Sequence, residues 1–363
     1  MKTMYPDYEN CIANLACSVL KYYGITPPNG TLAAADRLLN MEYKNVAVIL
    51  LDGMGVSIVK RHLGESGFFR KNTVCSYSSV FPPTTVAATT AIDSGLYPNQ
   101  SGWLGWSGYF DEIDRNVVYF WNIDNDTGEK LTENAAWTYV PYDSIRNKIS
   151  RTGINAHYLA PFVEPFPKDY GSFCGRIEEI CRDEGRQFIY AYWDDPDTAM
   201  HKDGVDSENI TEKLQDIEKR TEELTERLSD TLLIVTADHG HVNVKRRSLA
   251  DHQDICKCLL RMPSMETRAL NFFVKEGMKG KFEQAFLRHF GEDFILIPRE
   301  KFLSEGLFGT GENHPRLESM LGDYIGAAVG STDISNTTPG KSKGNHAGLT
   351  DEEMIIPLIA VSC

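Results

Sequence analysis

Three runs of mostly apolar residues mark the chain, and polar residues follow each of them within two positions. The runs cover Val46 to Leu51, Gln187 to Trp193 and Thr231 to Thr236. Continuous apolar runs of this length are typical of strands that are buried on both faces of a parallel sheet. We therefore predict three central strands, and the run IIPLIAV near the C-terminus adds a terminal strand.

Between these strands, apolar residues recur at every third or fourth position, which is the spacing of a helix with one buried face. The helices predicted in this way cover residues 9–23, 31–40, 56–63, 142–151, 172–185 and 208–229, and a further strand is expected at 155–160. Strands that alternate with helices indicate an α/β protein. We expect a central, mainly parallel sheet with helices on both faces.

Two segments interrupt this alternation. Residues 99–140 interleave aromatic residues with Gly, Asn and Asp and show no clear period, so we expect an excursion over the functional edge of the sheet. Further on, the pattern predicts strands at 256–261, 269–274 and 294–297 and a helix over 280–290. We expect cap elements within 99–170 and 242–320, on a single domain that spans residues 1–363.

The segment VFPPTTVAATTAIDSGLYP, Val80 to Pro98, predicts a strand end, a proline stop and then a helix. Thr84 or Thr85 is suited to the N-cap, and Gly95 ends the helix. A hydroxyl in the first helical turn lies near unpaired backbone N–H groups, which bind phosphate or sulfate oxygens. A capped core helix explains the same residues, so this segment alone does not decide the function.

Composition is that of an ordinary globular protein. Of the 363 residues, 42% are hydrophobic and 24% are charged, which is enough to bury a core. The formal net charge of −14 opposes attraction to nucleic-acid polymers and to anionic membranes. An anionic substrate would therefore need a local positive site, such as a metal ion.

The N-terminal segment MKTMYPDYENC lacks the pattern of a secretory leader, and no apolar run approaches the roughly 20 residues that span a bilayer. We therefore expect a soluble cytoplasmic protein, of an oligomeric state that the sequence does not determine. The eight cysteines are scattered, as is usual for reduced thiols. Cys256 and Cys258 alternate along a predicted strand, and we interpret them as packing residues and not as zinc ligands.

Aspartate and histidine residues follow the predicted strands. They are Asp52 after the first run, Asp197 and His201 after the second, Asp238 and His239 after the third, and His346 before the terminal strand. The spacing of four between Asp197 and His201 places both on one face of a helical turn. Taken singly, Asp52 and the Asp197/His201 pair are more often helix caps and a surface histidine, and His241 is either an outer neighbour or unrelated.

Taken together, these side chains should meet at the carboxyl edge of the sheet, where α/β proteins bind ligands. Three Asp and three His make two mixed sites that suit zinc, with manganese or iron also compatible. Two ions roughly 4 Å apart clamp the attacking and leaving oxygens of a displacement and lower the pKa of a nearby hydroxyl. The pattern therefore indicates metal-assisted phosphoryl transfer.

The sequence resembles the alkaline phosphatase superfamily and, within it, the nucleotide pyrophosphatase/phosphodiesterase-like (type I phosphodiesterase) branch. The resemblance rests on VILLDGMG, FPPTTVAATTAIDSGLYP, DDPDTAMH, VTADHG and GNHAGLTDEEMIIPLI, which occur in this order along nearly the whole chain. It implies an alkaline-phosphatase-like three-layer sandwich. It also implies two ion sites, one held by Asp197, His201 and His346 and the other by Asp52, Asp238 and His239.

The resemblance further implies a hydrolase of phosphodiester or nucleotide pyrophosphate bonds that acts through a phosphothreonine, which a metal-activated water then releases. The family's spacing puts the nucleophile at Thr85, ten residues before Gly95, with Thr84 as the competitor. The chain departs from the family where Trp106 replaces a phosphate-binding Asn. We expect Ser107, Asn99 or a backbone N–H to supply that donor instead.

The expected substrate is a small organic phosphate or a nucleotide. The aromatic residues of 99–140 would line a pocket for its base or another flat leaving group. Other functions stay open. The same site would suit a phosphomonoesterase, a sulfatase, a phosphonate hydrolase or a phosphomutase of the superfamily, which relative rates on paired aryl esters would separate. A protein that is merely stabilised by zinc, or a degenerate relative that binds phosphorylated ligands, would need no nucleophile.

Overall fold

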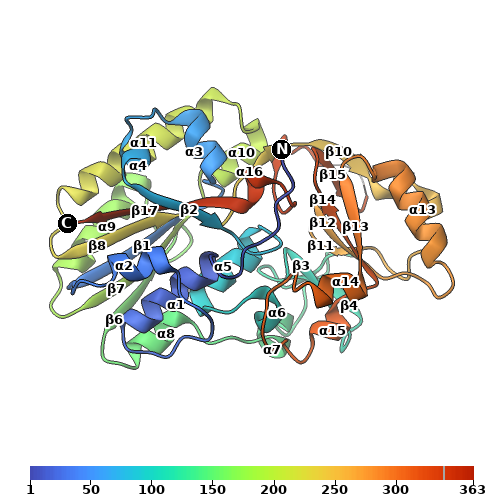
Figure 1. The fold of residues 1–363 in the computed structure, drawn as a ribbon, viewed down its shortest axis with the longest axis horizontal. Helices are drawn as coiled ribbons and strands as arrows, with labels where there is room; N and C mark the ends of the chain where they lie inside the picture. Colours follow the sequence, from blue (N-terminus) through green and yellow to red (C-terminus); the bar gives the residue numbers. More distant parts are fainter. Residues whose placement is uncertain (338–339) are drawn as a thin grey trace.

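Two lobes lie side by side in the computed structural model, which describes residues 1–337 and 340–363 (Figure 1). The first lobe is built on a six-stranded sheet and the second on a seven-stranded sheet. The described residues also form two small sheets, one of β9 (Val242–Asn243) with β16 (Gly344–Asn345) and one of β10 (Lys245–Ser248) with β15 (Thr332–Ser335).

The first sheet is mainly parallel, as predicted. Its strands, in spatial order, are β2 (Thr73–Ser78), β17 (Ile355–Ser362), β8 (Thr231–Thr236), β1 (Asn45–Leu51), β7 (Gln187–Trp193) and β6 (Asn155–Leu159). The strands β6, β7, β1 and β8 run parallel, whereas β17 runs antiparallel to both of its neighbours. Every residue of β1 is buried, which explains its continuous apolar run.

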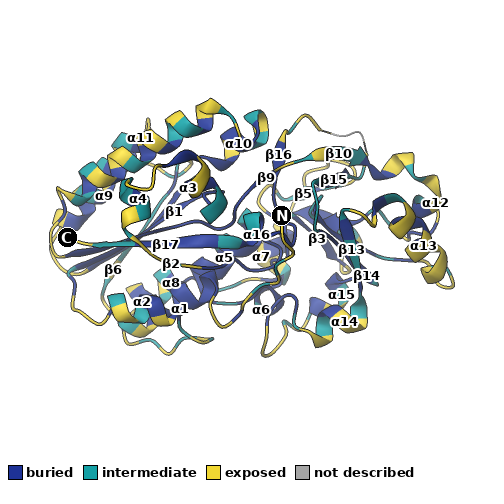
Figure 2. Ribbon diagram, turned by 45° about the horizontal axis from the view of Figure 1, so that its top comes forward, coloured by how far each residue is buried: buried dark blue, intermediate teal, exposed yellow. Residues whose placement is uncertain are grey.

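Helices cover both faces of this sheet (Figures 1 and 2). One face carries α1 (Ile12–Tyr22), α2 (Ala33–Leu38), α5 (Thr85–Ser94) and α8 (Ile145–Ser150); the other carries α3 (Val56–His62), α4 (Phe68–Lys71), α9 (Tyr170–Arg182), α10 (Asp197–Asp203) and α11 (Glu208–Thr225). The outer faces of α9 and α11 are exposed in Figure 2, because their apolar residues form a single stripe that packs inward. The predicted three-layer α/β fold is confirmed.

The second lobe is an antiparallel sheet formed by two distant segments of the chain. Its strands, in spatial order, are β13 (Phe294–Pro298), β14 (Tyr324–Ala328), β12 (Ala269–Phe272), β11 (Ser264–Met265), β3 (Ser107–Phe110), β4 (Arg115–Val118) and β5 (Ile123–Asp124). The helix α13 (Lys279–Phe290) packs Phe282 and Phe286 against Phe272 of β12. The remaining helical segments are α6 (Pro98–Ser101), α7 (Ala135–Tyr139), η1 (Leu249–Asp251), α12 (Gln253–Cys256), α14 (Arg299–Ser304), α15 (Leu317–Met320) and α16 (Asp351–Met354).

One expectation from the sequence is wrong in its local structure, and a second gains detail. The strand predicted at 256–261 is reduced to a single antiparallel bridge between Leu259 and Val274. The chain before it leaves α12 in a helical turn, and Cys256 and Cys258 direct their thiols to backbone oxygens of Leu249 and Asp254. The excursion at 99–140 contains regular structure, because it supplies β3, β4 and β5. Strands this short show too few alternations to be recognised by period.

All eight cysteines are free, as expected of reduced thiols. Among the described residues, every helix is too short or too polar to cross a lipid bilayer.

A buried ion pair ties the two lobes together. Arg268, just before β12, makes two hydrogen bonds to the carboxylate of Glu353 on α16, at 2.7 and 2.8 Å, and both side chains have zero exposure. Glu353 also accepts hydrogen bonds from the Gly348 N–H and the Thr350 hydroxyl. The pair therefore fixes the loop between His346 and the terminal strand against the second sheet.

We predict that Arg268→Met lowers the free energy of unfolding by about 3–5 kcal/mol, because it leaves the charge of Glu353 buried without a cation beside it. The exposed pair Arg151–Asp143 provides a control, and Arg151→Ala should change stability by no more than about 1 kcal/mol. Urea titrations of both variants measure the difference. Equal stability of the two variants would contradict the structural role of the buried pair.

Candidate active site

The ends of three parallel strands bring the predicted side chains together. Because β1 lies between β7 and β8, Asp52 after β1 is adjacent to Asp197 at the start of α10 and to Asp238 after β8. Backbone hydrogen bonds extend the contact beyond the strands: the Asp197 N–H donates to the Asp52 carbonyl at 3.1 Å, and the Gly53 N–H donates to an Asp238 carboxylate oxygen at 3.0 Å. Gly53 has a φ of +73°, and a Cβ there would lie 3.0 Å from the Cβ of Asp197.

The first group of side chains, which we call the Asp52 cluster, consists of Asp52, Asp238 and His239. The Nε2 atom of His239 lies 3.3 Å from Asp52 Oδ1 and 3.4 Å from Asp238 Oδ2. The hydroxyl of Thr85 lies 3.3 Å from the same Nε2 and 3.4 Å from Asp52 Oδ2. All three members of the cluster are buried, so the arrangement is shielded from water on the protein side.

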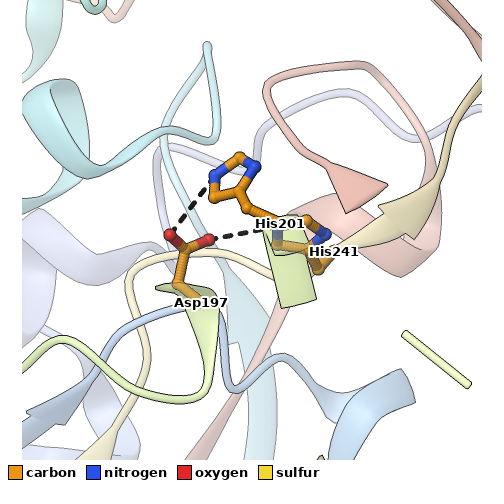
Figure 3. Close-up of side chains that lie close together, drawn as sticks. All are labelled: Asp197, His201 and His241. Carbon is orange, nitrogen blue, oxygen red and sulfur yellow. Dashed lines mark ion pairs between the residues drawn. The ribbon is translucent and has the colours of Figure 1, made fainter. Parts of the chain in front are cut away.

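The second group, the Asp197 cluster, consists of Asp197, His201, His241 and His346. The carboxylate of Asp197 lies 3.3 Å from His201 Nε2 and 3.1 Å from His241 Nε2, as Figure 3 shows. His346 approaches the same carboxylate at 3.9 Å. The rings of His239 and His346 stack with centroids 3.7 Å apart, so the two clusters are neighbours.

Three of these imidazoles are oriented by backbone carbonyls. The Nδ1 atoms of His201, His239 and His346 lie 3.0, 2.9 and 3.2 Å from the carbonyl oxygens of Gly344, Gly240 and Pro83. An Nδ1–H that donates to a carbonyl leaves Nε2 as the free lone pair, which is the arrangement of metal-ligating histidines.

The electrostatics of the two clusters fit bound cations. One oxygen of each aspartate, Asp52, Asp197 and Asp238, is buried without a hydrogen-bond partner. Burial and the repulsion from Asp197 raise the pKa of Asp52, and burial and the repulsion from Asp52 raise that of Asp238. Unpaired carboxylate oxygens next to imidazole nitrogens are a donor set for divalent metal ions.

The histidines respond to the same field. Although burial lowers the pKa of His239, the carboxylates of Asp238 and Asp52 raise it to about 10. A proton on His239 thus provides positive charge beside these carboxylates. A bound metal ion would replace that proton and provide the charge instead. Burial and the nearby His239 lower the pKa of His346, which keeps its imidazole neutral and able to act as a ligand.

Thr85 is the first residue of α5, and Thr84 is the N-cap. The Thr84 hydroxyl makes no capping hydrogen bond; it donates to the carboxylate of Glu266 at 2.6 Å. In the described chain, the backbone N–H groups of Thr85, Val86 and Ala87 have no protein partner. The geometry therefore distinguishes the two threonines, because Thr85 lies at the Asp52 cluster and Thr84 lies against the second lobe.

The residues expected to replace the family's Asn lie in different places. The Ser107 hydroxyl is 3.5 Å from the Met265 carbonyl and faces a neighbouring hollow, and the Asn99 amide bonds to Asn313 and to the Thr310 carbonyl. Trp106 lines the pocket beside Thr85, while its backbone N–H donates to Glu266 at 2.7 Å. Of the predicted donors, the free N–H groups of α5 are the ones next to the Thr85 hydroxyl.

A pocket of about 690 Å³ opens from Thr85, and aromatic side chains from both lobes form much of its wall. These aromatic residues are Trp106, Phe120 and Trp121 from the second lobe and Tyr142, Tyr158, Phe162, Tyr190 and Tyr192 from the first. The Tyr192 hydroxyl donates to Asp52. Arg146 also lines the pocket, but its guanidinium forms two hydrogen bonds with Asp93.

The sequence did not reveal four features of the site: Glu266, Tyr192, Arg146 and the position of His241. Tyr192 lies inside a predicted strand, and alternation along that strand is the one signal that could have shown which way its side chain points. Glu266 and Arg146 belong to no motif. Only the assembled fold brings them to the site.

An α/β fold with two buried Asp/His clusters beside a helix-terminal hydroxyl has the groups that a metal-dependent hydrolase needs. The family model for type I phosphodiesterase / nucleotide pyrophosphatase matches residues 46–275, and the chain belongs to this family. It is therefore a phosphoester hydrolase. No curated protein sequence matches the chain.

Solved structures support the fold. Murine ectonucleotide pyrophosphatase/phosphodiesterase 5, solved in an inactive form with AMP, aligns with a TM-score of 0.65 at 15% identity, over 89% of this chain and 88% of its own. The human protein of the same name aligns with a TM-score of 0.66 at 16% identity, over 87% of both chains. Phosphonoacetate hydrolase from Sinorhizobium meliloti, in complex with phosphonoformate, aligns at 0.65 and 12% identity, over 88% of this chain and 90% of its own.

We predict a pH-dependent contribution of Glu266 to stability. Burial raises its pKa from the ordinary 4.5 to about 7, although the hydrogen bonds from Thr84 and Trp106 oppose the shift. The unfolded chain then releases this proton at lower pH than the folded protein does, so stability falls as pH rises through this interval. Glu266→Gln removes the dependence.

Thermal unfolding of both proteins between pH 5 and pH 8, with a chelator present, measures the effect. As pH rises, the melting temperature of Glu266→Gln should increase relative to that of the unsubstituted protein. A constant difference across this range would show that Glu266 does not titrate there.

Proposed function

We propose that the protein is a two-metal hydrolase of phosphodiester or nucleotide pyrophosphate bonds with Thr85 as its nucleophile. The observation that carries the proposal is the position of the Thr85 hydroxyl, 3.3 Å from His239 Nε2 and 3.4 Å from Asp52 Oδ2, at a helix start whose N–H groups are free. A capped core helix does not require this placement beside buried carboxylates.

Two divalent ions are proposed, one held by Asp197, His201 and His346 and the other by Asp52, Asp238 and His239. Mixed nitrogen and oxygen donors favour zinc, with manganese or iron also compatible. When bound, such ions lower the pKa of a hydroxyl and neutralise charge on a phosphoryl group.

The protein's own groups then have distinct tasks. The Thr85 oxygen attacks phosphorus and loses its proton, the bond from phosphorus to the departing oxygen breaks, and a phosphothreonine forms. The free N–H groups of Val86 and Ala87 are suited to bind a non-bridging phosphate oxygen, in the role that the missing Asn would have. In a second displacement, water attacks phosphorus and releases the threonine.

The pocket supports a small substrate with a flat organic group. Trp106 and Trp121 stand edge to face with ring centroids 4.9 Å apart, and aromatic walls of this kind stack on nucleobases or aryl groups. The net charge of −14 supports a small nucleotide or organic phosphate over a nucleic-acid polymer or a membrane surface. The AMP and phosphonoformate bound by the aligned proteins are small phosphorus ligands of this kind.

We predict that Thr85→Ala abolishes turnover of p-nitrophenyl thymidine monophosphate while fold and metal content are retained. The reason is that the substitution removes the attacking hydroxyl and, besides it, only a methyl group. Thr85→Ser keeps a hydroxyl and should retain measurable activity. Steady-state rates with added zinc or manganese test this, and substantial activity of Thr85→Ala would refute the phosphothreonine route.

The substrate class follows from a matched panel. Rates on bis(p-nitrophenyl) phosphate, p-nitrophenyl phosphate, p-nitrophenyl phenylphosphonate and p-nitrophenyl sulfate should favour the diester. Faster turnover of the monoester, the phosphonate or the sulfate would leave the assignment of the site residues unchanged. It would assign the substrate to the corresponding branch of the superfamily. If none of them is turned over in any metal, the proposed function fails.

We also predict that Trp121→Ala raises KM for p-nitrophenyl thymidine monophosphate about 10-fold, because it removes a stacking surface. Methyl p-nitrophenyl phosphate has the same leaving group and no base, so its KM should change little. Trp137→Ala is the matched control, since Trp137 is 48% exposed and lies outside the pocket lining. Equal effects on both substrates would place the nucleoside elsewhere.

A further inference from the structure

His241 is a buried histidine at the site to which the family resemblance gives no role. Its side chain has zero exposure, and neither ring nitrogen has a hydrogen-bond partner. Its Nε2 lies 3.1 Å from Asp197 Oδ1, in an orientation that does not form a hydrogen bond (Figure 3). A fully buried polar ring without partners is costly unless another group satisfies it.

The strand pairing explains why His241 is there. Val242 of β9 pairs with Asn345 of β16 in an antiparallel register, so His241 just before β9 lies opposite His346 just after β16. The centroids of their rings are 5.5 Å apart, and the ring of His201 lies 4.7 Å from that of His241. The two-stranded sheet therefore delivers a pair of imidazoles to one carboxylate.

Packing holds the ring in this place. A Cβ at Gly344 would lie 2.8 Å from both Cε1 and Nδ1 of His241, so the glycine provides the space that the ring occupies. The Nε2 edge consequently faces Asp197, where the unpartnered Oδ1 of that carboxylate is also directed.

We infer that His241 is a fourth ligand of the ion proposed at the Asp197 cluster. Its donor set is then three imidazoles and one carboxylate, from His201, His241, His346 and Asp197, whereas the Asp52 cluster offers one imidazole and two carboxylates. More nitrogen donors favour zinc over manganese or magnesium. The two sites should therefore differ in affinity, and the Asp197 cluster should bind zinc more tightly.

This inference rests on the metal occupancy in the proposed function, but not on the reaction. The test is zinc binding by His241→Leu and His241→Asn, measured by competition with a chromophoric chelator, with circular dichroism as a check on the fold. We expect the tighter of two zinc affinities to fall about 100-fold or more, and the weaker one to stay unchanged. His157→Gln, on the outer strand β6, is the matched control and should bind zinc as the unsubstituted protein does.

X-ray absorption of the two-zinc protein supplies a second readout, because it reports the average number of imidazole ligands per zinc. We expect four histidine ligands in total for the two ions of the unsubstituted protein, and three in either variant. Three histidines in the unsubstituted protein, or a loss of affinity below about 10-fold, would make His241 only a neighbour that orients Asp197 and would overturn the inference. Absence of zinc binding would overturn it as well.

Turnover separates the two claims. If the His241 variants lose the tighter zinc while the unsubstituted protein hydrolyses no aryl ester, the ligand assignment stands and the proposed function fails. If ester hydrolysis depends on Thr85 but zinc binding is the same in all variants, the proposed function stands and the ligand assignment fails.

Discussion

Three carboxylates held together away from water are the constraint on which the site depends. Moving an ionised carboxylate out of water costs several kcal/mol unless cations or hydrogen bonds compensate. The protein compensates Asp52, Asp197 and Asp238 only in part, with imidazoles, the Tyr192 hydroxyl and the backbone N–H groups of Gly53 and His239, and it leaves one oxygen of each without a partner. A bound metal ion would therefore stabilise the fold and complete the site at the same time, so metal affinity and stability are linked here.

The fold meets this constraint with elements that are distant in the sequence. The order of the first sheet puts β1 between β7 and β8, so three consecutive strand ends supply the carboxylates. The last imidazole comes from a loop that the first sheet does not position. That loop is held by β16 pairing with β9 and by the Arg268–Glu353 pair, whose arginine belongs to the second lobe. The second lobe is therefore part of the site's support.

The sequence predicted the first lobe well and the second poorly, for a physical reason. Strands such as β1, with seven buried residues, have an unambiguous pattern, and Asp or His directly after them can be placed at the sheet edge. Strands of two or four residues, such as β11 and β3, carry too little pattern. Glu266 and Arg146 reach the site through tertiary contacts, which no local spacing encodes. His241 was visible in the sequence, but its role depends on the register between β9 and β16.

Glu266 couples the placement of the nucleophile to the shape of the pocket. One oxygen of this carboxylate accepts hydrogen bonds from the Thr84 hydroxyl and from the Trp106 N–H. Thr84 thereby gives up a capping hydrogen bond, which typically contributes about 1 kcal/mol to a helix. The helix is less stable as a result, but the N–H groups of Thr85, Val86 and Ala87 stay without partners in the described chain, near the Thr85 hydroxyl. Because the same carboxylate holds Trp106 in the pocket wall, a shift of the second lobe would move the aromatic wall and the helix start together, and substrate binding and nucleophile alignment would change as one.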